Sequence, residues 1–172
     1  MIPNDNKLWA PWRMEYIERE VANKSERCFL CDKPKSEDNE KTLILLKGKL
    51  TFVVMNLYPY NNAHLMISPY RHISEFTALS KEERSESQEL IAGSIKILSK
   101  HMNPEGFNVG LNIGKAGGAG VEEHLHWHLV PRWLGDTNFM PVLGNTKVIM
   151  EGLTDSYRKL QPDFAELEKS LL

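Results

Sequence analysis

The segment HLHWHLVPRW, residues 124–133, constrains the fold of this chain more than any other stretch. Successive side chains of a β-strand point to opposite faces, and alternate residues lie about 6.6–6.8 Å apart along the strand. The segment therefore predicts a strand that buries one face in the core and presents a row of imidazoles on the other. The apolar face comprises Leu125, Trp127 and Leu129, and the histidine face comprises His124, His126 and His128.

Length and composition are typical of one globular domain with a substantial core. The chain has 172 residues, of which 41% are apolar and 26% are charged. A net charge of −2, from 21 basic and 23 acidic residues, gives no general attraction to nucleic acid. No apolar run approaches the roughly 20 residues of a membrane span, and the first residues lack the pattern of a secretory signal. We therefore expect a cytoplasmic protein without a nucleic-acid or membrane partner.

Hydrophobic patterning predicts an α+β fold in which helices cover an antiparallel sheet. Pro131 limits how far the histidine strand pairs as an interior strand. The sequence SKEE at 80–83 is a capping box, which predicts a helix that begins after Ser80 and continues to about Lys100. Runs of β-branched and apolar residues predict further strands at 42–46, 51–56, 64–68 and 106–112.

The two ends of the chain carry weaker signals. Residues 1–25 are expected to form an arm with Trp9 and Trp12 as aromatic anchors. Apolar spacing near the other end predicts a short edge strand over 139–143 and a helix over 148–160.

A row of three histidines is a candidate functional site, because a purely structural row would place three groups side by side that repel one another when protonated. Two functional interpretations follow: three ligands of a catalytic zinc, or a nucleophilic histidine assisted by its neighbours. The loop at 112–120, NIGKAGGAG, favours the second, because its glycines let backbone amides approach an anion closely. Flexible linkage is the structural alternative for this loop.

The motif HLHWHLV resembles the His-φ-His-φ-His-φ-φ signature, with φ apolar, of the histidine triad (HIT) superfamily of nucleotide hydrolases and transferases. The upstream NLYPYNNAHLMISPYRH resembles a second conserved block, so the resemblance covers 42–133. The stretches LWAPWRMEYI and DTNFMPVLGNTKVI resemble a longer bacterial branch that includes diadenosine tetraphosphate phosphorylases. The resemblance implies a HIT-like fold, a homodimer, and one domain over 1–172 with a helical tail over 145–172.

The resemblance also implies a mechanism on dinucleoside polyphosphates or related nucleoside phosphate derivatives, including phosphoramidates. His126 would attack the α-phosphorus to form a nucleotidyl-histidine, which water or phosphate resolves, and His128 would contact the phosphoryl oxygens or the leaving group. A nucleotide-binding sensor or scaffold with negligible turnover is the alternative. The loop residues expected to contact substrate are Asn112, Gly118, Ala119 and Gly120, the last standing where many family members carry glutamine.

The strands that precede the triad are expected to hold the nucleoside. Asn56 and Leu57 are the candidates for the nucleoside pocket. His64 matches a family histidine beside the active site, and it either supports the triad or only satisfies a backbone carbonyl.

The sequence CFLC contains the only two cysteines, Cys28 and Cys31. In a cytosolic chain such a pair is a metal half-site, two buried thiols or a redox pair, and no βαβ unit surrounds it to favour the last. A resemblance to galactose-1-phosphate uridylyltransferases implies that His72 and His124 complete a structural zinc site, with His101 as a spare ligand. No organic cofactor is expected.

Overall fold

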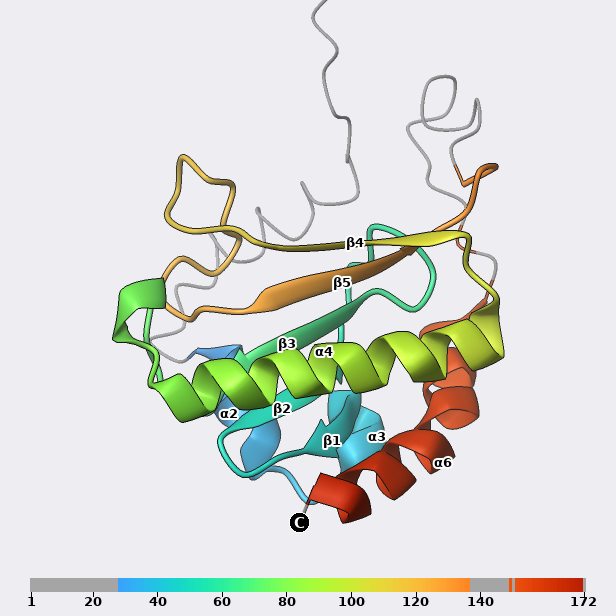
Figure 1. The fold of residues 1–172 in the computed structure, drawn as a ribbon, viewed down its shortest axis with the longest axis horizontal. Helices are drawn as coiled ribbons and strands as arrows, with labels where there is room; N and C mark the ends of the chain where they lie inside the picture. Colours follow the sequence, from blue (N-terminus) through green and yellow to red (C-terminus); the bar gives the residue numbers. More distant parts are fainter. Residues whose placement is uncertain (1–27, 137–148, 150, 172) are drawn as a thin grey trace, which may run out of the picture.

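A computed structural model of the protein describes residues 28–136, 149 and 151–171. Five strands form one antiparallel sheet in the order β1-β2-β3-β5-β4 (Figure 1). The strands are β1 (Ile44–Lys47), β2 (Thr51–Met55), β3 (Leu65–Pro69), β4 (Gly106–Leu111) and β5 (Trp127–Arg132). The predicted α+β class is confirmed.

Helices pack against this sheet. The long α4 runs across β2 and β3, and α6 packs against β1 and α4 (Figure 1). The helices are α2 (Phe29–Asp32), α3 (Asn39–Thr42), α4 (Lys81–Met102) and α6 (Leu153–Leu171), with short 3-10 turns η1 (Lys33–Lys35) and η2 (Phe76–Ala78). Fully buried Leu90 and Leu98 of α4 and Phe164 of α6 join the strands in one core.

Strand β5 lies between β3 and β4, and its apolar side is buried as the alternation predicts. The exposed fractions of Leu125, Trp127 and Leu129 are 2%, 4% and 0%. Pairing with β3 ends at Leu129, whereas pairing with β4 continues to Arg132. The strand is therefore interior only before Pro131, which lacks the N–H that a ladder requires.

Several predicted boundaries differ from the structure. Thr42 ends α3 and the next residue, Leu43, caps that helix with a left-handed φ of 62°, so β1 begins only at Ile44. Similarly, β5 begins at Trp127, after the first two histidines of the row. The tail helix begins later than predicted and continues through Pro162, with its second half held by the buried Phe164.

Other expectations fall outside the described residues. These are the arm over 1–25 and the edge strand over 139–143. Within the described part of the chain, none of the helices combines the length and apolar character needed to cross a membrane.

The start of α4 is fixed by the predicted capping box and by an ion pair. Ser80 Oγ accepts a hydrogen bond from the Glu83 amide at 3.1 Å, and Glu83 Oε2 accepts one from the Ser80 amide at 2.7 Å. Arg71 also donates to Glu83, from Nε at 2.7 Å and Nη2 at 2.6 Å. Arg71, with the Ser80 contacts, lowers the pKa of the buried Glu83 carboxyl to about 2. The segment after β3 is thereby tied to α4.

We expect Glu83→Gln to lower the free energy of unfolding at pH 7 by about 1–2 kcal/mol, measured by urea denaturation. The expected loss is close to that for removal of a helix cap. The ion pair adds little to it, because Arg71 is half exposed and stays solvated. Since the pKa of Glu83 is lower in the folded state, its contribution is present above pH 4.5 and disappears as the pH falls toward 2. The exposed neighbour Glu82 provides the control, and Glu82→Gln should change stability by less than about 0.5 kcal/mol.

Candidate functional site

The imidazoles of the predicted row lie at the start of β5. His126 and His128 are neighbours, with ring centroids 4.8 Å apart and planes at 74°. His126 is 4% exposed and His124 is fully buried, whereas His128 is half-buried. The hydrogen bonds of each ring differ, and they determine which nitrogen carries a proton.

His126 has its Nδ1 2.8 Å from the backbone carbonyl oxygen of His124. A carbonyl only accepts hydrogen bonds, so Nδ1 carries the proton and donates it. In the neutral ring, Nε2 is then the unprotonated nitrogen and carries the lone pair. That lone pair makes His126 Nε2 a competent nucleophile.

His64 and His128 form a chain of hydrogen bonds with one consistent direction. The amide N–H of Tyr60 donates to His64 Nδ1 at 3.1 Å, and Asn56 Nδ2 lies 3.3 Å from the same nitrogen. With Nδ1 accepting, neutral His64 carries its proton on Nε2, which lies 3.0 Å from His128 Nδ1. His128 Nδ1 therefore accepts, and the proton of the neutral His128 ring lies on Nε2.

Tyr60 packs its ring against both members of this chain. Its ring centroid lies 4.6 Å from that of His64 and 5.6 Å from that of His128. His64 is 1% exposed, so its hydrogen bonds are shielded from competing water. The supporting role expected for His64 stays a prediction, and its contact with His128 favours that role.

The glycine-rich loop follows β4 and has the backbone shape that its composition indicates. A Cβ on Gly117 would lie 2.3 Å from the carbonyl oxygen of Ile113, and Gly118 has a φ of +82°. Both positions therefore require glycine. Asn112 Nδ2 donates to the Gly118 carbonyl at 3.2 Å and closes the loop.

The loop amides expected to contact an anion are hydrogen-bonded within the loop. The Gly118 amide donates to Lys115 O at 3.0 Å, and the Ala119 amide donates to Gly114 O at 3.3 Å. Gly120 is exposed where the loop leaves this turn. An anion bound here would have to replace these bonds, so the contacts stay predictions.

The two nucleoside candidates differ in their surroundings. Asn56 Oδ1 accepts from the Tyr58 amide at 2.9 Å, which turns its Nδ2 toward His64. Leu57 is 52% exposed and offers an apolar surface in the loop between β2 and β3. Asn56 therefore contacts the imidazole chain directly, and Leu57 is available for a base or ribose.

The four predicted metal ligands come together from distant parts of the chain. The ligand atoms of Cys28, Cys31, His72 and His124 all lie within 4.8 Å of one another. His124 Nδ1 lies 3.3 Å from Cys28 Sγ and 3.4 Å from Cys31 Sγ, and His72 Nδ1 lies 3.3 Å from Cys31 Sγ. A tetrahedral zinc with bonds of about 2.3 Å to sulfur and 2.0–2.1 Å to nitrogen has S···N edges of about 3.5 Å. The group fits such an ion.

Hydrogen bonds around this group favour metal binding. His124 Nε2 donates to the Pro69 carbonyl at 2.9 Å, which leaves Nδ1 unprotonated toward the cysteines. Burial and then the neighbouring Cys28 raise the pKa of the Cys31 thiol to about 11. Two thiolates side by side are unfavourable without a cation, and a divalent ion between them would remove this repulsion.

A zinc held by all three histidines of the row does not match this geometry. His124 faces the cysteines, and His126 Nδ1 is bonded to a carbonyl oxygen. Among the residues that the structure describes, the Cys28-containing group is the one set of three or more candidate ligands that lies close enough for a metal. His101, the spare candidate, instead bonds Asp163 Oδ2 at 2.6 Å.

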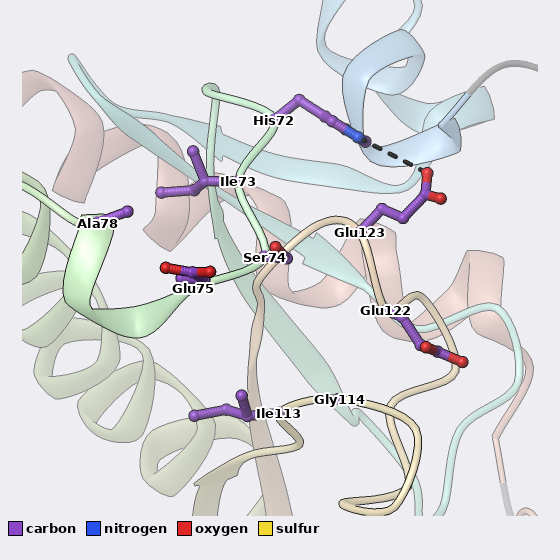
Figure 2. A pocket seen from close by; sticks show the side chains of 9 residues that line it. All are labelled: His72, Ile73, Ser74, Glu75, Ala78, Ile113, Gly114, Glu122 and Glu123. Carbon is purple, nitrogen blue, oxygen red and sulfur yellow. Dashed lines mark ion pairs between the residues drawn. The ribbon is translucent and has the colours of Figure 1, made fainter.

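An open hollow of about 670 Å³ lies between the segment 72–78 and the glycine-rich loop (Figure 2). Its apolar lining comes from Ile73, Ala78 and Ile113, and three carboxylates, Glu75, Glu122 and Glu123, also line it (Figure 2). Glu123 also lies 3.9 Å from His72 Nε2. Neither His126 nor His128 lines the hollow, and three carboxylates oppose a polyphosphate. The hollow is therefore an unfavourable place for a polyphosphate.

The sequence did not point to the residues that hold the loop before β3. Asn61 and Asp136 are 75 positions apart, and Asn61 Nδ2 donates to Asp136 Oδ2 at 2.8 Å. The signals that would have drawn attention are Asn61 within the turn-rich NLYPYNN and Asp136 four residues after Arg132.

Comparisons with known proteins agree with this geometry. The HIT domain model matches residues 37–133. The AP-4-A phosphorylase of Mycobacterium tuberculosis is 40% identical over 164 residues, which cover 92% of this chain and 84% of that protein. The bis(5'-adenosyl)-triphosphatase of Dictyostelium discoideum is 27% identical over 124 residues, 72% of this chain and 82% of that protein.

The fold of the chain is also similar to that of a solved histidine triad protein. A Zn-bound histidine triad family protein from Mycobacterium smegmatis superposes with a TM-score of 0.66 at 19% identity, covering 85% of this chain and 99% of that one. The chain therefore belongs to the HIT domain family. The predicted resemblance to its diadenosine tetraphosphate phosphorylase branch is confirmed by the 40% identity.

We expect the purified protein to hold about one divalent metal ion per chain, and Cys31→Ser to lose most of it, because three donors bind far more weakly than four. Metal content after dialysis, measured by elemental mass spectrometry, is the test. His101→Asn is the control, since His101 lies outside the group, and should keep the metal. Equal metal content in Cys31→Ser would contradict this assignment.

Proposed function

We propose that the protein transfers nucleotidyl groups from dinucleoside polyphosphates through a covalent intermediate on His126. The observation that carries the proposal is the pairing of an unprotonated His126 Nε2 with the donor Nε2–H of the adjacent His128. The names of two relatives, AP-4-A phosphorylase and bis(5'-adenosyl)-triphosphatase, support this substrate class.

In the first step, the lone pair of His126 Nε2 forms a bond to the α-phosphorus. The bond from that phosphorus to the bridging oxygen breaks, and its electron pair leaves with the departing nucleotide. The Nδ1–H of His126 stays on the ring, and its hydrogen bond to the His124 carbonyl stabilises the positive charge that the ring acquires. Water or inorganic phosphate then attacks the same phosphorus and restores the free imidazole.

His128 stabilises charge and does not need to transfer a proton. The leaving group is a phosphate whose second pKa is about 6, so it departs as an anion at neutral pH. A hydrogen bond from His128 Nε2–H to the leaving oxygen or to a nonbridging oxygen is sufficient. This agrees with a neutral His64–His128 chain, which has no further proton to supply.

The remaining contacts follow from the same placement of the phosphate. We assign Asn112 and the amides of Gly118, Ala119 and Gly120 to the nonbridging oxygens, and Asn56 and Leu57 to the nucleoside. The short loop that closes through Asn112 supports the first assignment, and the exposed apolar surface of Leu57 supports the second. Phosphate as the acceptor is supported by the 40% identity to a protein named as a phosphorylase.

We assign zinc to the group formed by Cys28, Cys31, His72 and His124. Two thiolates and two imidazoles are a usual donor set of structural zinc, and zinc here would tie the N-terminal part of the chain to the start of β5. The Zn-bound protein from Mycobacterium smegmatis with the same fold supports this choice of ion.

We further propose a cytoplasmic homodimer. Two cysteines without a disulfide suit a reducing compartment. Within the described residues, β4 is an edge strand, and its Val109 is 47% exposed. An edge with an exposed apolar side chain suits pairing with a second copy.

For the proposed homodimer, sedimentation velocity should give twice the chain mass of 19.7 kDa, and a monomer at working concentration would contradict the proposal.

His126→Ala should lower turnover of diadenosine tetraphosphate by about 10⁴-fold or more, because it removes the atom that bonds to phosphorus. Released nucleotides are measured by chromatography, with and without added phosphate. Intact-mass spectrometry of acid-quenched samples should find a nucleotidylated wild-type chain and none in the variant. His101→Ala serves as the control histidine and should retain both. Normal turnover in a folded His126→Ala protein would refute the mechanism.

A further inference from the structure

We propose that Asp136 is a positioning residue that fixes which nitrogens of His64 and His128 carry protons, acting through Asn61 and the loop before β3. The inference rests on the proposed function, in which His128 must present an N–H to the phosphate. It adds a residue whose described hydrogen bonds run to Arg132, Trp133 and Asn61.

The Asp136 carboxylate is buried and fully engaged. Its side chain is 6% exposed, and Arg132 donates to both oxygens, at 2.6 Å from Nε and 3.0 Å from Nη2. The Trp133 amide adds a contact at 3.2 Å. The negative charge is therefore balanced by Arg132 of β5, and Oδ2 also accepts hydrogen bonds from the Trp133 amide and from Asn61.

Asn61 connects this carboxylate to the loop. Its Nδ2 donates to Asp136 Oδ2 at 2.8 Å and to the Pro131 carbonyl at 3.0 Å. Both partners only accept hydrogen bonds, so a flipped carboxamide would direct its oxygen at two acceptors. The side chain is held in one orientation, and the loop is held to the end of β5.

The backbone next to Asn61 determines the state of His64. The Asn61 carbonyl accepts from the His64 amide at 3.2 Å, and the amide of the preceding Tyr60 donates to His64 Nδ1 at 3.1 Å. Between them, Ala63 has a left-handed φ of 53°, a conformation that non-glycine residues adopt only when their surroundings impose it. Release of Asn61 would therefore let the loop relax and withdraw the Tyr60 amide.

Withdrawal of that amide would change the triad without touching it. His64 Nδ1 would then keep only the longer 3.3 Å contact from Asn56 Nδ2, so part of the protein would carry the His64 proton on Nδ1, leaving Nε2 as an acceptor opposite His128 Nδ1. His128 would then carry its own proton on Nδ1 and present a bare Nε2. A bare nitrogen repels phosphate oxygens, so the donor required for transfer would be lost.

The chain offers a matched control for this role. Glu83 is likewise a buried carboxylate, 4% exposed, paired with an arginine and bonded to a backbone amide. Its contacts reach Arg71 and Ser80, and neither of these bonds to the triad among the described contacts. A loss of general stability should affect Glu83→Gln and Asp136→Asn alike, and only the second should change the imidazoles.

The test reads the ring protonation directly in the full-length, metal-loaded protein. Long-range ¹H–¹⁵N NMR of histidine should find His64 and His128 with the proton on Nε2 in the wild type. In Asp136→Asn both should show a mixture with the Nδ1–H form, and kcat should fall about 10- to 100-fold with little change in KM. Glu83→Gln should keep the wild-type spectrum and kcat.

A second variant covers the case in which Asp136→Asn does not fold. Asn61→Ala leaves the Asp136–Arg132 pair intact and should give the same mixture. Wild-type ring protonation in both variants, or in the one that folds, overturns the inference whether or not the protein turns over substrate. A changed protonation with unchanged kcat would sustain the positioning and overturn the role of His128 in the proposed function, so the two failures are distinguishable.

Discussion

Burial of one side of the segment 124–132 is the constraint on which the rest of the structure depends. Leu125, Trp127 and Leu129 are almost fully buried. Burial of each side chain stabilises the folded state by on the order of 2 kcal/mol. Because side chains alternate, that burial fixes the direction of every second residue, and a slip of one position would exchange the faces of the apolar side chains and the histidines. The pairing of β5 with both β3 and β4 holds this register. The arrangement of the histidines is thus a consequence of the burial of three apolar side chains.

Features that rest on local pattern could be predicted from the sequence. The helix after Ser80 follows from the capping box and the apolar spacing that it precedes, and both are in the structure. The apolar side of the histidine strand follows from alternation in the same way. The metal group is a different case: the residues alone left the cysteines open between metal and free thiols, and only a resemblance supplied His72 and His124. The structure brings all four donors together, although they come from three separate segments.

Features that depend on contacts between distant residues could not be predicted. Alternation treats the three histidines as equivalent, yet their protons are set by different partners: Pro69 for His124, a main-chain carbonyl for His126, and His64 for His128. The contact of Asn61 with Asp136 joins a loop to a turn across 75 positions, and the local pattern around each residue does not indicate that the two are partners. Apolar spacing placed the tail helix over 148–160, whereas the helix of the structure continues past Pro162 to Leu171, where the buried Phe164 joins the core.

His124 links the proposed metal group to His126, the proposed nucleophile, through two parts of one residue. Its side chain faces Cys28 and Cys31, and its carbonyl oxygen accepts the hydrogen bond from His126 Nδ1. Any ion that fixes the His124 ring also restrains the peptide that carries this carbonyl, since the ring is further tied to Pro69 at its other nitrogen. The hydrogen bond that leaves His126 Nε2 unprotonated is therefore held in place from the metal side. The loop before β3 holds His128 separately, through the Tyr60 amide and His64. In the proposed mechanism these two sets of contacts would keep the unprotonated Nε2 of His126 toward phosphorus and the Nε2–H of His128 toward a phosphate oxygen.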